Sequence, residues 1–209
     1  MSEDADGGRL ALWDWRRRMA ALYAEVRAAK DPETGWRLWR AERDALCREH
    51  PQSPFEPEQR VEFTGLDYWD YDPAFRFAVG LSAVENAPSR QVETGTDGTM
   101  VMTPCARTEG LVGRLGRELT LYWIEGYGGG IFLPFRDAST GKTTYGGGRY
   151  VLDTLKGADL GSTSGGGTIL DFNFAYNPSC AYSPRWVCPL APPENTLPIS
   201  IEAGERFGA

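Results

Sequence analysis

The sequence is poor in positive charge and has no long apolar run. Its 22 Lys and Arg residues are outnumbered by 29 Asp and Glu residues, which gives a formal net charge of −7. A chain without a basic stretch lacks the electrostatic footprint of a nucleic-acid-binding protein, and no segment approaches the ~20 apolar residues of a membrane span. The N-terminal string MSEDADGG is acidic and polar, unlike a signal peptide. We therefore expect a soluble cytoplasmic protein with neither nucleic acid nor membrane as a partner.

Metal ligands and cofactor motifs are also scarce. His50 is the single histidine, and seven residues separate Cys180 from Cys188, whereas structural zinc sites use closely spaced pairs. The string TGKTT at residues 140–144 ends like a phosphate-binding P-loop, but Arg136 stands where that loop needs a glycine. No metal site is predicted, and no cofactor is indicated. In the cytoplasm the four cysteines are expected to be thiols.

The N-terminal part has the pattern of helices. Residues 1–8 are expected to be disordered, and residues 9–50 to form a helical cover. Apolar side chains fall on one stripe at helical spacing, at Leu12, Trp15, Met19, Leu22, Tyr23 and Val26. Asp31 followed by Pro32 is a helix-start signal, so a second helix should run to about Glu49. These helices would cover the core or contact a second subunit, which leaves a homo-oligomer open.

Residues 51–209 are expected to form an antiparallel β-domain. Apolar residues alternate between Phe75 and Ala83 with the period of a half-buried strand. Turn signals then recur with no room for crossover helices, which favours hairpins. Further strands are expected at 91–94, 99–103, 111–115, 119–125 and 168–173, with a hairpin tip at 128–130, a glycine loop at 161–167 and an irregular proline-rich wrap at 178–198. The prediction is one domain of the α+β class, mainly β, with an antiparallel β-barrel or sandwich covered by two helices.

Three strings in the C-terminal half are specific enough to indicate a family. They read PFRDASTGKTTYGGGRYVLD, DFNFAYNPSCAY and CPLAPPEN. They closely resemble the signature of a prokaryotic family catalogued as domain of unknown function number 1684, and the resemblance extends over about residues 36–198. It implies no particular reaction. By motif position it points to Asp137, Tyr145, Gly148, Arg149, Asp171, Asn173, Asn177, Cys180, Cys188, Glu194 and Asn195.

Polar residues in these strings are candidates for a site. Arg149 follows three glycines in an expected strand, where an unpaired buried arginine would be strongly destabilising. Either it pairs with Asp137 or Asp171, or its planar fork binds an anionic ligand. Asp171 and Asn173 alternate along the chain and are expected to share one strand face. That face is either exposed to solvent or the wall of a cavity, and Tyr145 as a neighbour favours the cavity.

Two further residues could take part in chemistry. Cys180 follows an expected turn, where unpaired backbone amides would lower a thiol pKa and make it a nucleophile. The alternative is that Cys180 and Cys188 are small buried side chains that hold an irregular segment. Glu194, with Asn195 beside it, either clasps a loop or serves as a general acid or base.

Three functions follow as hypotheses. The first is binding of a small polar or anionic molecule in a pocket of the β-domain, lined by Tyr145, Arg149, Asp171, Asn173, Asn177 and Cys180. The second is an enzyme of unknown reaction that uses the same pocket, with Asp171 or Glu194 as general acid or base and Cys180 as nucleophile. The third is a scaffold or subunit-interaction module, in which the polar residues bind one another and the helices meet a partner.

Overall fold

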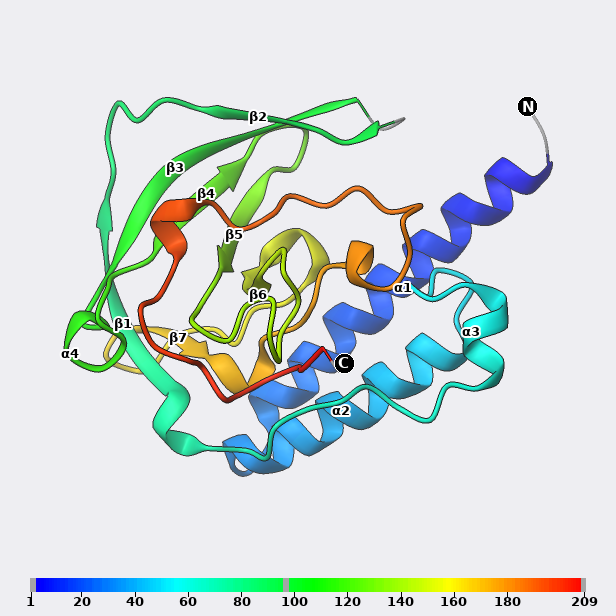
Figure 1. Ribbon diagram of the computed structural model, residues 1–209, viewed down its shortest axis with the longest axis horizontal. Helices are drawn as coiled ribbons and strands as arrows, with labels where there is room; N and C mark the ends of the chain where they lie inside the picture. The colour runs from blue at the N-terminus through cyan, green and yellow to red at the C-terminus, as the bar shows by residue number, and fades with distance from the viewer. Residues whose placement is uncertain (1–2, 96–97, 208–209) are drawn as a thin grey trace.

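Two long helices pack against a curved antiparallel sheet that is nearly closed into a barrel (Figure 1). The computed structural model describes residues 3–95 and 98–207. About 33% of the chain is helical and 26% is in strands. The expected β-barrel with N-terminal helices is therefore confirmed. No helix of the described residues has the length and apolar character that a bilayer crossing requires.

Helix α1 spans Glu3–Ala28 and helix α2 spans Pro32–Glu49. The carboxylate of Asp31 accepts a hydrogen bond from the Thr34 amide at 2.8 Å, as expected of a helix cap. The two helices lie side by side along one side of the barrel (Figure 1). Their inner faces bury side chains of both helices, including Met19, Leu22, Tyr23, Val26, Trp36, Trp39 and Leu46.

The first helix begins earlier than the sequence predicts. It starts at Glu3, whereas a disordered tail was expected over residues 1–8; residues 1–2 lie outside the described part of the chain. The Gln52 side chain donates a hydrogen bond to the Gly8 carbonyl at 3.2 Å. This tertiary contact joins the polar first turns to the loop after α2, and local composition gives no sign of it.

Within residues 3–95 and 98–207, seven strands form the sheet. They are β1 Arg76–Ala83, β2 Arg90–Glu93, β3 Thr99–Glu109, β4 Thr120–Ile124, β5 Gly130–Phe135, β6 Arg149–Asp153 and β7 Thr168–Asp171. All neighbours are antiparallel, in the order β6-β5-β4-β3-β1-β7, and β2 pairs with β3 outside this path. The ends of the sheet approach each other where Tyr150 of β6 bridges to Tyr176, just after β7.

One expected strand is a short helix. Residues 111–115 were predicted as extended, but α4 spans Val112–Leu115. The Glu118 carboxylate accepts hydrogen bonds from the amides of Gly110, Leu111 and Val112 at 2.9, 2.9 and 3.1 Å, and these satisfy the donors at the start of the turn. Leu111 and Leu115 are both buried, and a spacing of four fits a helix as well as alternation fits a strand.

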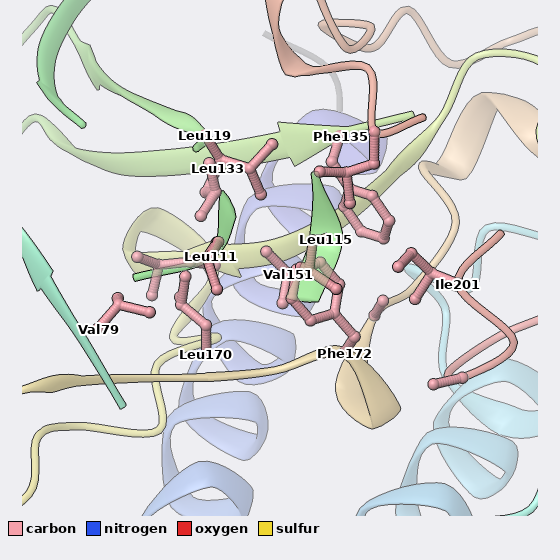
Figure 2. Close-up of a cluster of buried hydrophobic side chains, with 14 of the residues drawn as sticks. Val79, Leu111, Leu115, Leu119, Leu133, Phe135, Val151, Leu170, Phe172 and Ile201 are labelled. Carbon is pink, nitrogen blue, oxygen red and sulfur yellow. The ribbon is translucent and has the colours of Figure 1, made fainter. Parts of the chain in front are cut away.

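A hydrophobic core fills the interior of the sheet (Figure 2). Figure 2 shows Leu133 and Phe135 of β5, and Leu119 just before β4, in one cluster with Leu111 and Leu115. The surface that these described side chains present inside the barrel is apolar. A second core, made by the buried faces of α1 and α2, lies between the helices and the sheet.

The remaining elements are short turns, namely α3 Pro57–Val61 and the 3-10 turns η1 Pro73–Phe75, η3 Thr154–Lys156, η4 Phe172–Phe174, η5 Ser179–Ala181 and η6 Pro193–Asn195. Beyond η4 the chain is otherwise irregular and runs across the sheet toward β4 (Figure 1, orange to red). Asn195, fully buried, fixes this crossing: its amide nitrogen donates to the carbonyls of Thr120 and Pro134, both at 2.8 Å.

Candidate functional site

Arg149 is held by the protein itself. It lies on β6 with 1% of its surface exposed. One guanidinium nitrogen donates to the Asp137 carboxylate at 2.7 Å and to the Ile201 carbonyl at 2.9 Å, and the other donates to the carbonyls of Ala203 and Glu205. Burial lowers the pKa of Arg149, and the charge of Asp137 opposes that shift. Of the two alternatives for this residue, the structure shows the ion pair, with Asp137 as the partner and Asp171 elsewhere.

Asp171 and Asn173 do not share a strand face, because β7 ends at Asp171 and the chain turns into η4. The Asp171 carboxylate accepts hydrogen bonds from Arg76 at 2.9 Å and Tyr71 at 3.2 Å. The Asn173 amide group pairs with the backbone of Asp72 through two bonds of 2.9 and 2.8 Å. Both side chains are fully buried. Burial raises the pKa of Asp171, with Arg76 opposing, so this carboxylate is part of an internal network.

Glu194 lies on η6, on the outer surface near β2 and β4. Its carboxylate accepts hydrogen bonds from the Tyr122 hydroxyl at 2.7 Å and the Arg90 guanidinium at 2.6 Å. Partial burial would raise the pKa of Glu194, but these donors and the Arg90 charge outweigh it and lower the pKa. A carboxylate held ionised in this way is poorly suited to donate a proton near neutral pH.

Asn177 belongs to a second buried network. Its amide nitrogen donates to Glu205 at 3.1 Å and to the Arg206 carbonyl at 2.9 Å. Glu205 in turn pairs with Arg43 of α2 at 2.8 Å. The side chain is 3% exposed, yet its Oδ1 atom has no hydrogen-bond partner among the described residues. A buried acceptor without a donor costs about 1–3 kcal/mol, so this atom requires an explanation.

A cavity of about 230 Å³ lies between α1, the end of α2 and the segment 176–189. Its apolar wall includes Trp15, Met19, Tyr23, Tyr176, Tyr182 and Trp186. The segment is fixed over the cavity by hydrogen bonds from Arg185 to the Ser53 carbonyl, at 2.8 Å, and from the Trp186 indole to the Pro54 carbonyl, at 3.1 Å. Of the residues predicted to bind a ligand, Asn177 lines this cavity; the other five do not.

The charge of the cavity wall has one sign. Arg16, Arg43 and Lys156 line it, and no Asp or Glu is among the described lining residues. Arg43 is neutralised by Glu205. Lys156 is 47% exposed and lies 3.7 Å from Asp153, and Arg16 is exposed on α1. The positive charge available to a ligand is therefore concentrated at the solvent side, while the interior is aromatic.

A pair of cysteines lies at one end of the cavity. Cys188 lines it, and the backbone amide of Cys180 donates to the Cys188 sulfur at an N–S distance of 3.4 Å. The sequence predicts that backbone amides at the turn would stabilise the Cys180 thiolate, but the amide of Cys180 donates to the sulfur of Cys188 instead. The interaction with the Cys180 thiol, that amide and the charge of Lys156 lower the pKa of Cys188 to about 6, with burial opposing. The interaction with Cys188, together with burial, raises the pKa of Cys180.

Tyr145 lies next to this pair. Its hydroxyl donates to the Cys180 carbonyl at 3.4 Å and to the Cys180 sulfur at 3.6 Å. The structure therefore brings Tyr145 and Cys180 together, as expected, whereas Arg149, Asp171 and Glu194 are bonded to other protein groups. Sequence reasoning missed Cys188 as the more acidic thiol. No local signal could have found it, because its partner amide is eight positions away across an irregular loop.

Comparisons with known proteins give a family but no function. The chain matches the family described as protein of unknown function, DUF1684, over residues 61–206. The uncharacterised protein from gene locus rrnAC0354 of Haloarcula marismortui, solved by solution NMR, is 36% identical, with 83% of this chain and 93% of that chain covered and a TM-score of 0.56. No curated protein matches significantly. The chain therefore belongs to the DUF1684 family of proteins of unknown function.

Proposed function

We propose that the protein binds a small organic anion with an apolar body in the cavity between α1 and the segment 176–189, and that it does so in the cytoplasm. The observation that carries this proposal is the lining: Arg16 and Lys156 lie at its solvent side, Arg43 is paired with Glu205, no described lining residue is an Asp or Glu, and the rest of the wall is largely apolar. The sequence favours a small polar or anionic ligand, and this proposal narrows that class to an anion with an apolar body. Its place is different, because the polar atoms of Arg149, Asp171 and Asn173 are occupied by protein groups.

The cavity size limits the ligand. At roughly 30 Å³ for each water molecule in the liquid, a volume of about 230 Å³ corresponds to about eight waters. This is below the usual ~300–1,000 Å³ of pockets for drug-sized molecules. A molecule with one ring or a short chain matches this volume.

The distribution of groups also sets the orientation. The apolar body lies inward, against Trp15 and Met19, where burial of apolar surface stabilises the complex by about 25 cal/mol per Å². The anionic group lies at the mouth, near Arg16 and Lys156.

A matched pair of compounds tests the proposal. We expect 4-hydroxybenzoate to bind saturably, followed by the fluorescence of Trp15 and Trp186, and 4-hydroxybenzyl alcohol to bind more weakly because it lacks the charge. At a hundred times its Kd a ligand stabilises the folded state by about 2.7 kcal/mol. For a domain of this size that is a rise in Tm of about 5–11 °C.

Charge variants provide the control. The double variant Arg16→Gln with Lys156→Gln should weaken 4-hydroxybenzoate binding by about tenfold, or 1.4 kcal/mol. Arg17→Gln is the matched control, since Arg17 lies on the same helix and pairs with Asp14 at 3.4 Å outside the cavity. The proposal is wrong if neither compound binds saturably, if the alcohol binds as tightly as the acid, or if the double variant binds like the parent.

A further inference from the structure

Two partly exposed cysteines are neighbours at one end of the cavity. The Cys188 sulfur lies against the backbone of Cys180, whose amide nitrogen is 3.4 Å from it. Both side chains are partly accessible to solvent. A disulfide between them can therefore form through movements of two side chains within one irregular loop, without bringing distant segments together.

From this juxtaposition we propose that Cys188 and Cys180 form a reversible dithiol–disulfide centre, in which Cys188 is oxidised by a hydroperoxide and Cys180 resolves the product. The proposal does not depend on the ligand proposed above. It concerns the sulfur atoms at the end of the cavity, and it is tested without any ligand.

The roles follow from the surroundings of each sulfur. Cys188 receives the Cys180 amide and the charge of Lys156, and both stabilise a thiolate. Cys180 keeps its proton and is held in place by the Tyr145 hydroxyl at 3.6 Å. The thiolate is the nucleophile toward peroxides, and a second thiol beside it is the usual arrangement for resolving a sulfenic acid.

The reaction balances as follows. The Cys188 thiolate attacks the terminal oxygen of the hydroperoxide; the O–O bond breaks, and the departing alkoxide takes up a proton to become an alcohol. Cys188 is then a sulfenic acid. The Cys180 sulfur attacks the Cys188 sulfur, the S–S bond forms as the S–O bond breaks, and the leaving hydroxide takes the Cys180 proton to become water. Two thiols lose two electrons to one hydroperoxide, and an external dithiol reverses the step.

The other two cysteines are poor candidates for the same chemistry. Cys47 is buried in the core between the helices and the sheet, and burial raises its pKa to about 12. Cys105 lies on β3, its thiol donates to the Leu121 carbonyl at 3.4 Å, and burial raises its pKa as well. Neither has another cysteine as a neighbour among the residues whose contacts are described. They serve as internal controls.

The test uses the full chain, reduced, and treated with tert-butyl hydroperoxide. Alkylation and peptide mapping should show a Cys180–Cys188 cross-link with Cys47 and Cys105 still free, and dithiothreitol should restore all four thiols. In Cys180→Ser, dimedone should trap a sulfenic acid at Cys188. An ordinary thiol with a pKa near 8.5 is only ~3% ionised at pH 7, so Cys188→Ser should slow oxidation by about 30-fold.

Three outcomes would overturn the proposal. They are the absence of the cross-link, oxidation of Cys105 at the rate of Cys188, and a Cys188→Ser rate equal to that of the parent. Cys105→Ser is the matched control and should oxidise as the parent does. Cys188→Ala is measured beside Cys188→Ser, with circular dichroism of both, so that an unfolded variant is not taken for an unreactive one.

Discussion

Replacing Arg149 with methionine removes a buried charge that makes four hydrogen bonds and leaves Asp137 without its partner. The methionine keeps most of the apolar volume, so a cavity is a minor part of the effect. The carboxylate remains fully buried, and it can no longer share its charge with a cation. Three backbone carbonyls lose their donors at the same time.

The expected loss is large. Breaking a buried ion pair by removing one partner costs about 3–5 kcal/mol. For a domain of this size each kcal/mol lowers Tm by about 2–4 °C, so Arg149→Met should lower Tm by about 6–20 °C. If the Arg149 guanidinium were instead unpaired in the free protein and reserved for a ligand, Arg149→Met would remove an unpaired buried charge. The free protein would then be as stable as the parent, or more stable.

Equilibrium unfolding in urea, followed by tryptophan fluorescence, measures the effect. The control is Arg90→Met, which breaks an ion pair of similar length, 2.6 Å, in which the two side chains are 48% and 36% exposed. Exposed pairs contribute about 0–1 kcal/mol. The reasoning is refuted if Arg149→Met costs no more free energy of unfolding than Arg90→Met. If the reasoning holds, Asp137→Ala should lower the free energy of unfolding much less in the Arg149→Met background than in the parent, because the ion pair is already broken.

Three further outcomes can be measured with similar means. Asn195→Ala should cost about 1–3 kcal/mol in urea unfolding, because it removes a donor from the buried Pro134 carbonyl and from the partly buried Thr120 carbonyl. Hydrogen bonds hold the pKa of Glu118 below its ordinary 4.5, although burial opposes them. The ionised Glu118 should therefore stabilise the folded protein fully above pH 4.5. The difference in free energy of unfolding between the parent and Glu118→Gln should vanish as the pH falls through the pKa of Glu118 in the folded state. Alkylation of Cys188 should accelerate as the pH rises through about 6, while Cys47, with a pKa of about 12, stays unlabelled until the protein unfolds.

The sheet was predictable where one face of a strand is buried and the other is not. Alternation near residues 75–83 and the turn signals at 96–98 and 115–118 give β1, the β2–β3 hairpin and the start of β4 within a few residues. The helix start at Asp31 was equally clear, because its cap is local. The short helix α4 was not predictable. It depends on hydrogen bonds from backbone amides to the Glu118 side chain in the following turn, and these do not appear in the spacing of apolar residues.

The site was predictable only in part. The string DFNFAYN alternates like a strand, but the Asp171 side chain accepts the Asn173 amide at 3.0 Å and starts a 3-10 turn, which changes where every later side chain points. The cavity joins α1 to a loop more than a hundred residues later. The α1 wall carries no motif, and the meeting of the two walls depends on contacts such as Arg185 with Ser53, which no periodicity reveals.

The polar residues Arg149, Asn177 and Asn195 of the family-like strings are hydrogen-bonded to the protein itself, and these bonds hold the chain around the cavity in place. Arg149 binds the carbonyls of residues 201–205, and Asn177 binds Glu205, so the last part of the chain is tied to β6 and to α2. Asn195, which lies between the segment 176–189 and residues 201–205, is hydrogen-bonded to Thr120 of β4 and Pro134 of β5. With its outer contacts fixed in this way, the segment 176–189 presents its inner side, including Cys188, to α1. Variants of the fixing residues should therefore lower stability and binding together, whereas variants of Arg16 or Lys156 should lower binding while the free energy of unfolding stays within about 0.5 kcal/mol.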